Sequence, residues 1–349
     1  MAEILNIAVI GCLHGELQKV YETLEKIQRT KKTKIDLVLC CGDFQSVRDK
    51  GDLESMAIPP KHRRLMDFYK YYDGTLTAPF LTIFVGGNHE ASNFLCELPF
   101  GGWVARNIYY MGHSNVLNFG GMRIGGISGI FKSYNYNRAH VEAPPFNDNT
   151  LRSVYHVRKI DVDKFFALED IDVMLSHDWP TGIWKYGDLN YLLSRKPFFK
   201  DDINDNTLGC RHFMELIHCI KPTFYFCAHM HVDFYATVPH DGKTTEFLAL
   251  DKVLPRRIFY HVFQMKATAP KRLCYDPIWL AITKLYAPYH RCDSYSIPTL
   301  NLTDEHVQEI IHCVPDLGVP DNFQFVESTD NLSGRTLDNL QTSEFCKMI

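Results

Sequence analysis

The sequence predicts an α/β (α+β) protein with layered sheets, and two observations lead to that fold class. Short β-rich runs recur along the chain, and each ends in a polar or glycine-rich cluster. Between the first two runs, residues 17–29 carry apolar side chains at helical spacing, namely Leu17, Val20, Tyr21, Leu24 and Ile27. Strand, helix and strand in that order are typical of an α/β core.

The β-rich runs share one design, an apolar stretch followed at once by polar residues. In chain order they are Ile4 to Ile10 before Gly-Cys-Leu-His-Gly, Ile35 to Cys41 before Gly-Asp-Phe, Phe80 to Val85 before Gly-Gly-Asn-His-Glu, Ile171 to Leu175 before Ser-His-Asp, and Thr223 to Cys227 before Ala-His-Met-His. Further strands are predicted at Met122 to Gly129, Asp233 to Val238 and Thr245 to Leu250.

The domain organisation follows from the point in the chain where this pattern of apolar runs with polar ends stops. Residues 1–240 form the predicted catalytic domain, with a Tyr-, Asn- and Pro-rich insert at about 130–158. A loop of this length inside a compact domain is usually functional. Residues 241–325 are interpreted as a smaller C-terminal domain, and 326–349 as a poorly ordered polar tail.

Composition excludes several protein classes. The chain has 349 residues with a formal charge of -4, so it lacks the basic excess of a general polyanion binder, and any RNA contact must be local. The 11 cysteines are scattered and never spaced as CxxC, which favours reduced thiols in an intracellular protein. The N-terminus does not resemble a secretory signal, and no window approaches the ~20 apolar residues that span a bilayer. We therefore expect no membrane association.

Residues of the type that bind metals follow five of the predicted strands. They are Cys12, His14, Asp43, Asn88, His89, His177, His229 and His231. Because binding sites in α/β sheets form at the carboxyl ends of strands, we expect these side chains to share one crevice. The two oxygens of Asp43 allow it to bridge two divalent cations, which at roughly 3.5–4 Å apart suit phosphoryl chemistry. His89, next to Asn88, is placed to donate a proton to a leaving oxygen.

Each residue also has a structural interpretation. A histidine after a strand is usually a hydrogen-bonded or surface residue, and Asp43 and Asn88 are of types common in turns. Cys12 alone would be a small buried hydrophobe. The order and number of these residues together favour the functional interpretation.

The same motifs resemble those of the calcineurin-like metallophosphoesterases. The matching segments are Gly11 to Gly15, Gly42-Asp43, Gly87 to Glu90, His177 and Ala228 to His231. The resemblance implies a β-sandwich flanked by helices. It also implies one metal site from Cys12, His14, Asp43 and His231, a second from Asp43, Asn88, His177 and His229, and His89 as the catalytic histidine.

Cys12 departs from the family pattern, which usually has aspartate there. Because thiolate is a soft ligand, it favours Fe²⁺ or Zn²⁺ over Mg²⁺. The expected cofactor is one or two divalent ions per site, with Fe²⁺, Zn²⁺ and Mn²⁺ as candidates.

A closer resemblance is to the RNA lariat debranching enzymes. It depends on Cys12 with His14, on Ser176 to Pro180, on Gly126 to Ile130 and on the segment TEFLALDKVLPRR at 245–257. It implies hydrolysis of the 2′–5′ phosphodiester of branched intron RNA, a role in mRNA processing and intron turnover, and a nuclear location with shuttling to the cytoplasm. DNA is not an expected partner, and protein partners are left open.

The insert has a composition suited to RNA, because aromatic rings stack on bases and basic groups contact phosphates. The predicted substrate contacts are Tyr134, Tyr136, Asn137, Arg138, His156, Arg158, Lys61 and Asp178. Two alternatives keep the fold but change the function. One is a phosphoesterase for a small phosphomonoester or cyclic nucleotide, and the other is a scaffold without catalytic activity.

Overall fold

Two β-sheets form the centre of the computed structural model, which describes residues 3–326 and 339–349. The first sheet has the order β12 (Tyr260–Lys266), β1 (Ile4–Ile10), β2 (Leu37–Cys40), β3 (Thr82–Phe84), β5 (Ile108–Tyr110) and β4 (Gly102–Ala105). The second has the order β10 (Phe234–His240), β11 (Lys243–Ala249), β9 (Phe224–Cys227), β8 (Val173–Ser176), β7 (Met122–Ile127), β6 (Ser114–Phe119) and β13 (Leu273–Tyr275).

Parallel pairing at the middle of each sheet determines where the polar loops gather. β1, β2 and β3 are parallel neighbours, and so are β7, β8 and β9. The carboxyl ends of parallel strands lie at one edge of a sheet, so the loops after β1, β2 and β3 emerge together, as do those after β8 and β9. The two sets meet because the sheets pack face to face, which is the predicted sandwich.

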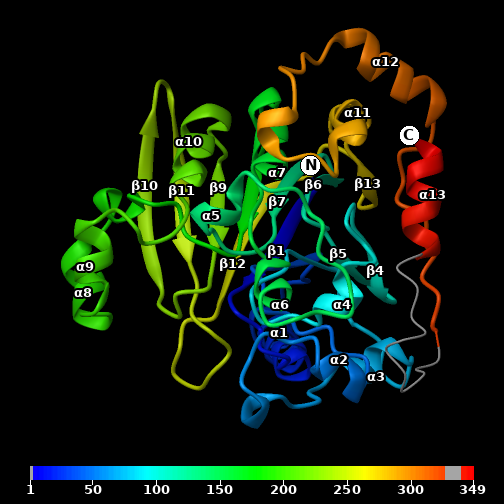
Figure 1. The fold of residues 1–349 in the computed structure, drawn as a ribbon. Coiled ribbons are helices and arrows are strands. Elements are labelled where there is room, and N and C mark those ends of the chain that lie inside the picture. The colour runs from blue at the N-terminus through cyan, green and yellow to red at the C-terminus, as the bar shows by residue number, and fades with distance from the viewer. Residues whose placement is uncertain (1–2, 327–338) are drawn as a thin grey trace.

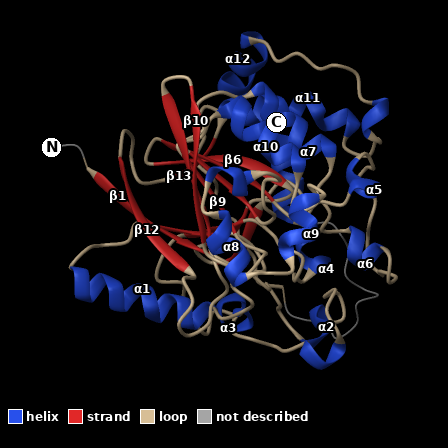
Figure 2. Ribbon diagram, turned by 90° about the vertical axis from the view of Figure 1, so that its left-hand side faces the viewer, coloured by secondary structure: helices blue, strands red, loops and turns tan. Residues whose placement is uncertain are grey.

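Helices cover the outer faces of both sheets, as Figures 1 and 2 show. One apolar cluster lies between the sheets, and the other two lie between a sheet and its helices. The helices are α1 (Leu17–Lys31), α2 (Lys50–Leu53), α3 (Phe68–Tyr72), α4 (Ser92–Leu95), α5 (Ser133–Tyr136), α6 (Thr150–Ser153), α7 (Lys159–Asp163), α8 (Leu189–Arg195), α9 (Phe199–Asn204), α10 (Arg211–Ile220), α11 (Pro277–Tyr286), α12 (Asp304–Cys313) and α13 (Leu340–Met348). The described residues also form the 3₁₀ turns η1 (Pro60–His62), η2 (Lys164–Ala167), η3 (Ile183–Tyr186), η4 (Ala287–Tyr289) and η5 (Ser294–Ser296).

The helix predicted at 17–29 is α1, and its pattern explains its position. Leu17, Val20, Tyr21 and Leu24 are buried, which is one face of a helix with 3.6 residues per turn. The helix ends at Lys32, which adopts the left-handed conformation that commonly terminates helices. Each strand predicted from the sequence is present within a few residues of its expected bounds.

Residues after 240 contribute to both sheets. β11 lies between β10 and β9, β12 pairs with the full length of β1, and β13 pairs with β6. Helices α11 and α12 then pack against each other. The segment 241–325 therefore shares the apolar cores of the catalytic region, and a division at 240 is a boundary in sequence only.

The predicted tail needs a correction. Part of it, 327–338, lies outside the described residues, but Leu340–Met348 forms helix α13 beside β4. Gln341 accepts from the Trp103 N–H at 2.7 Å and donates to the Trp103 carbonyl at 2.9 Å, and Phe345 stacks on Phe100. The prediction of disorder is wrong for this helix because one buried aromatic and one satisfied amide anchor an otherwise polar segment.

Two expectations from composition can be compared with the structure. All eleven cysteines are free thiols, as predicted. Among the described residues, no helix combines the length and the apolar character needed to span a membrane.

Candidate metal centre

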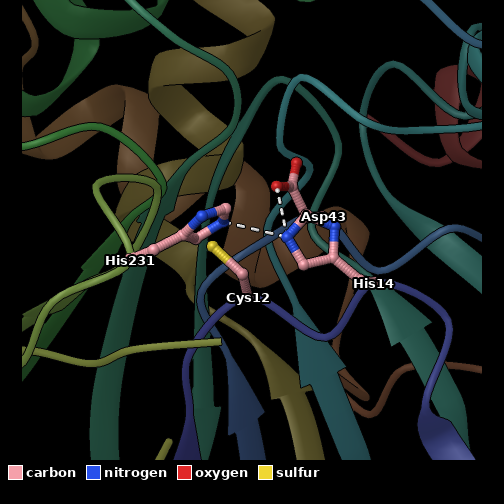
Figure 3. Close-up of side chains that lie close together, drawn as sticks. All are labelled: Cys12, His14, Asp43 and His231. Carbon is pink, nitrogen blue, oxygen red and sulfur yellow. Dashed lines mark hydrogen bonds and ion pairs between the residues drawn. The ribbon is translucent and has the colours of Figure 1, made fainter. Parts of the chain in front are cut away.

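The eight donor residues converge from five strand ends. Cys12 and His14 follow β1, Asp43 follows β2, Asn88 and His89 follow β3, His177 follows β8, and His229 and His231 follow β9. Four of them, Cys12, His14, Asp43 and His231, place one ligand atom each within 4.8 Å of the others (Figure 3). The sheets thus bring together residues that lie up to 219 positions apart.

The first donor set is centred on His14. Its Nε2 atom lies 2.9 Å from Nε2 of His231 and 3.6 Å from Oδ2 of Asp43. The Cys12 sulfur accepts a hydrogen bond from the backbone N–H of His229 at 3.1 Å. Two imidazole nitrogens, a carboxylate oxygen and a sulfur therefore face one small volume.

The second donor set uses the other oxygen of Asp43. Oδ1 lies 3.3 Å from Nε2 of His177, and that nitrogen lies 3.2 Å from Oδ1 of Asn88. The His177 ring is held in place because its Nδ1 donates to the Cys41 carbonyl at 2.7 Å. The His229 ring lies beside it, with ring centres 4.9 Å apart. The two oxygens of Asp43 thus point to different sets of donors.

His89 lies at the margin of both sets. Its backbone N–H donates to Oδ1 of Asp43 at 2.9 Å, which couples the loops after β3 and β2. Its ring centre is 5.2 Å from that of His14. The side chain is only partly buried, so an imidazole at this position can reach a group that approaches from solvent.

The backbone of the centre is strained. His14, Asp43, His229 and His231 all have positive φ, between 48° and 62°. Left-handed conformations are uncommon outside glycine, although aspartate and histidine tolerate them better than most residues. The neighbouring Gly42 cannot be replaced freely, since a Cβ there would lie 2.3 Å from Nδ1 of His177. Such strain accumulates at functional sites.

Burial fixes the protonation states of the donors. It lowers the pKa of His14 and His177, and it lowers that of His229 to about 4 and that of His231 to about 3. Burial opposes ionisation of Asp43, but the surrounding histidines outweigh it and hold the pKa of that carboxyl below its usual value. At neutral pH the centre holds neutral imidazoles around one carboxylate.

This arrangement fits a divalent cation. Neutral imidazole nitrogens and a carboxylate are the protonation states that metal ligands require. Burial, followed by the charge of Asp43, raises the pKa of the Cys12 thiol. A cation at this position would reverse that effect, because a coordinating thiol loses its proton. The convergence of these donors at the strand ends agrees with the site expected from the sequence.

Glu90 is a residue whose role the sequence did not reveal. It is buried, and its two oxygens accept from the backbone N–H groups of Gly87, Phe44 and Gln45, each at 2.8 Å. These bonds connect the loop carrying Asp43 to the loop carrying Asn88 and His89. The only signal in the sequence was its place directly after Asn88 and His89, in the motif that carries two site residues.

Four of the predicted substrate contacts are buried inside the protein. Arg158 is 0% exposed and pairs with Glu142 at 2.6 Å, while Tyr136 stacks on His212 with ring centres 4.1 Å apart. His156 bonds to Asn135, and Asp178 accepts from the N–H groups of Phe131 and Trp179. The polar atoms of these four side chains are used within the fold in this structure, so an RNA contact by them stays a prediction.

The other four lie at the surface. Tyr134 is 72% exposed, and Lys61 is exposed on η1. Arg138 pairs with Asp293 at 3.2 Å and Asn137 accepts from the hydroxyl of Ser294 at 2.9 Å, so both also attach the insert to the segment after α11. Of the four, Tyr134 presents the largest free apolar surface.

Comparisons with known proteins agree with the geometry. A family model described as calcineurin-like phosphoesterase matches residues 5–233, and one described as lariat debranching enzyme, C-terminal domain, matches residues 242–349. The lariat debranching enzyme A of Xenopus laevis is 45% identical, over 98% of this chain and 69% of that protein. The lariat debranching enzymes of Homo sapiens and Gallus gallus are each 44% identical, over 99% and 98% of this chain and 69% of each protein.

Proposed function

The chain belongs to the lariat debranching enzymes of the calcineurin-like phosphoesterase family, and from that membership we propose that it hydrolyses the 2′–5′ phosphodiester of intron lariats. The products are a linear RNA with a 5′-phosphate and a free 2′-hydroxyl on the branch nucleotide. The observation that carries the proposal is the convergence of the Cys12, His14, Asp43 and His231 donor atoms within 4.8 Å, beside His89.

A divalent cation is implied by the family, and we assign its ligands from the geometry. Cys12, His14, Asp43 and His231 would hold one ion, and Asp43, Asn88, His177 and His229 would hold a second. The opposite orientation of the two Asp43 oxygens supports a shared ligand. The soft sulfur and the imidazoles favour Fe²⁺, Zn²⁺ or Mn²⁺. Such ions supply Lewis-acid chemistry, lowering the pKa of water and stabilising charge on phosphoryl oxygens.

The protein's own residues orient the reaction. Asp43 stays ionised and holds the loops after β2 and β3 together, because it accepts a hydrogen bond from the His89 N–H. Water adds to phosphorus on the side opposite the branch 2′-oxygen and releases one proton to solvent, and the bond between phosphorus and that oxygen breaks. The His89 imidazole donates its proton to the departing 2′-oxygen, so that a neutral hydroxyl leaves. Glu90 keeps the His89 loop against the Asp43 loop.

The substrate also determines where the enzyme works. Introns are released as lariats in the nucleus, so we place the protein there for at least part of its life. Exposed Tyr134 supports an RNA contact by the insert, since an exposed aromatic ring provides a stacking surface for a base.

The test uses a synthetic branched RNA with one 2′–5′ linkage among ordinary 3′–5′ linkages. The purified protein is stripped with a chelator and then supplied separately with Fe²⁺, Zn²⁺ or Mn²⁺. The expected result is scission at the branch alone, restored by cation. Cleavage of 3′–5′ linkages at a similar rate would make the protein a general nuclease. Faster turnover of a small phosphomonoester would favour that substrate class, and inertness with every ion would favour a scaffold.

A further inference from the structure

The loop between β11 and β12 lies directly against the candidate metal centre. The Val253 N–H donates to the carbonyl of Cys12 at 3.1 Å, which ties the loop to a ligand residue. The loop is closed at its base because the Asp251 N–H donates to the Ile258 carbonyl at 2.9 Å. Asp251 is fully buried, and its carboxylate accepts from the Lys252 N–H at 2.7 Å. The position of this loop is therefore fixed relative to the centre.

Three basic residues lie on this loop, and Lys196 lies within electrostatic reach of two of them; we call the four the basic rim: Lys196, Lys252, Arg256 and Arg257. Lys196 comes from the connection between α8 and α9. Burial lowers the pKa of Lys196, the charge of Asp251 opposes that shift, and the charges of Arg257 and Lys252 add to it, so these groups lie within electrostatic reach of Lys196. Lys252 directly precedes Val253, whose N–H donates to the Cys12 carbonyl, and this contact places the rim beside the centre.

Most of this positive charge is not neutralised by the protein. Arg257 pairs with Asp251 at 3.1 Å, yet its side chain is still 41% exposed. Within residues 3–326 and 339–349, Lys196, Lys252 and Arg256 take part in no ion pair. Like charges that lie close together repel one another. The chain as a whole has a net charge of -4, so this excess of positive charge is a local feature of the rim. A polyanion on the rim would offset the repulsion.

Apolar groups interleave with these charges. Phe198 is 69% exposed, and Nζ of Lys196 lies 5.7 Å from its ring centre. Ile258, at the end of the loop, is 55% exposed. Proteins that bind single-stranded nucleic acid combine a positive path for phosphates with aromatic surfaces for bases. The rim has both features, which favours a single strand over a free phosphate.

The insert approaches the centre through different ligand residues. The Phe131 N–H donates to the carboxylate of Asp178 at 2.8 Å, next to His177, and the Gly129 N–H donates to the Gly86 carbonyl at 2.8 Å. The rim instead contacts Cys12. A branch nucleotide joins three strands, so a site that accepts it needs more than one path for RNA.

We infer that the basic rim binds the phosphates of one single-stranded arm of the branched RNA, while the insert contacts another part of the substrate. This inference rests on the proposed function and adds a second RNA surface to it. The rim is a positioning surface, since it contacts an arm and not the scissile phosphate.

The test compares two branched RNAs, one with long arms and one with arms cut back to single nucleotides. In the double variant Lys196→Ala/Arg256→Ala, kcat/KM should fall roughly tenfold further on the long-armed RNA than on the short-armed RNA, because KM rises. Loss of two single-strand phosphate contacts should also make the salt dependence of log KM shallower by about 1.4. The single variant Lys252→Ala changes only the loop, and its KM on the two RNAs gives a second measurement.

The matched control is Lys31→Ala/Lys34→Ala, which removes two exposed lysines at the far end of α1. This control should behave as wild type on both RNAs. Equal effects of the rim variant on the two RNAs, or none, would overturn the inference. A wild-type protein that cuts neither RNA would instead defeat the proposed function, and the inference with it, before any variant is measured.

Discussion

The loops after the strands and the insert at 130–158 use similar residues in opposite ways. Both contain histidine and asparagine. In the strand-end loops, the polar atoms converge on one volume and still have lone pairs to offer. In the insert, His156 is bonded to Asn135 and Arg158 to Glu142, so the polar atoms are already satisfied. Residue type alone therefore does not separate a binding group from a structural one.

The two regions also differ in backbone energy. The ligand-bearing loops include five non-glycine residues with positive φ, namely His14, Asp43, Gln45, His229 and His231, whereas no insert residue from 130 to 158 has positive φ. The strand-end loops tolerate strain to place their donors, and the insert does not. Substitutions in the first region should therefore reduce activity, and substitutions of buried residues in the second should reduce stability.

The largest effect is expected for Asp43→Asn. This change keeps the shape of the side chain but removes the only carboxylate shared by both donor sets. Loss of several kcal/mol of stabilisation should lower kcat/KM by roughly 10³–10⁵-fold and reduce cation content. Branched-RNA kinetics and elemental analysis measure both. Asp73→Asn, at an exposed position, is the control, and wild-type cation content in Asp43→Asn would remove Asp43 from the ligand set.

His89→Ala should have the next largest effect, on turnover and not on the cation. Without a proton donor for the departing oxygen, kcat should fall by about 10²–10⁴-fold. Cation content should stay at the wild-type value, because only the backbone of His89 contacts Asp43. Single-turnover kinetics with elemental analysis make the measurement, and His62→Ala, an exposed histidine, is the control. Near wild-type turnover would exclude His89 as the proton donor.

A matched pair of tyrosines tests the insert itself. Tyr136 is 5% exposed and packed on His212, so Tyr136→Ala should lower the free energy of unfolding by roughly 3 kcal/mol or more. Tyr134 is 72% exposed, so Tyr134→Ala should leave stability within about 0.5 kcal/mol of wild type. Its effect should instead be a raised KM, since stacking on a base contributes about 1–3 kcal/mol.

Urea unfolding and branched-RNA kinetics on both variants separate these outcomes. If Tyr134→Ala unfolded more easily than Tyr136→Ala, the structural assignment of the two rings would be reversed. If neither changed KM, the insert would not use Tyr134 for recognition.

The last effect is a pH dependence of stability that should be absent at neutral pH. Burial, followed by the charge of Arg158, lowers the pKa of His156 from 6.5 to about 4. The unfolded chain therefore takes up the proton first as the pH falls. The free energy of unfolding should decrease between pH 6.5 and 4, by up to about 3 kcal/mol from this group, and level off below.

Urea unfolding across that range, for wild type and His156→Asn, measures the difference in slope. The exposed His62→Asn is the control. Equal slopes for wild type and His156→Asn would show that the insert is not held by a neutral imidazole at this position.

A feature could be predicted from the sequence when the residues that determine it lie close together along the chain. Asp43 and His177 could be identified because each lies within a few residues of an apolar strand, and the positions of those strands in the sheets bring the two side chains together. Strand β12 could not be predicted, because its partner β1 lies some 250 positions away and the burial of its own residues does not alternate regularly. The burial of Arg158 was hidden for a similar reason, since its position depends on carbonyl groups and a carboxylate supplied by the folded insert. Helix α13 was missed because Phe345 acts through Phe100 and Tyr275, both distant in sequence.

The left-handed backbone at His14, Asp43, His229 and His231 has an evolutionary consequence. Glycine would adopt these angles at a lower cost, by about 1 kcal/mol at each position. A descendant released from catalysis would gain stability by drifting to glycine there, because stability is under selection even where activity is not. The strained residues are therefore expected to persist only in descendants that still use the centre they build.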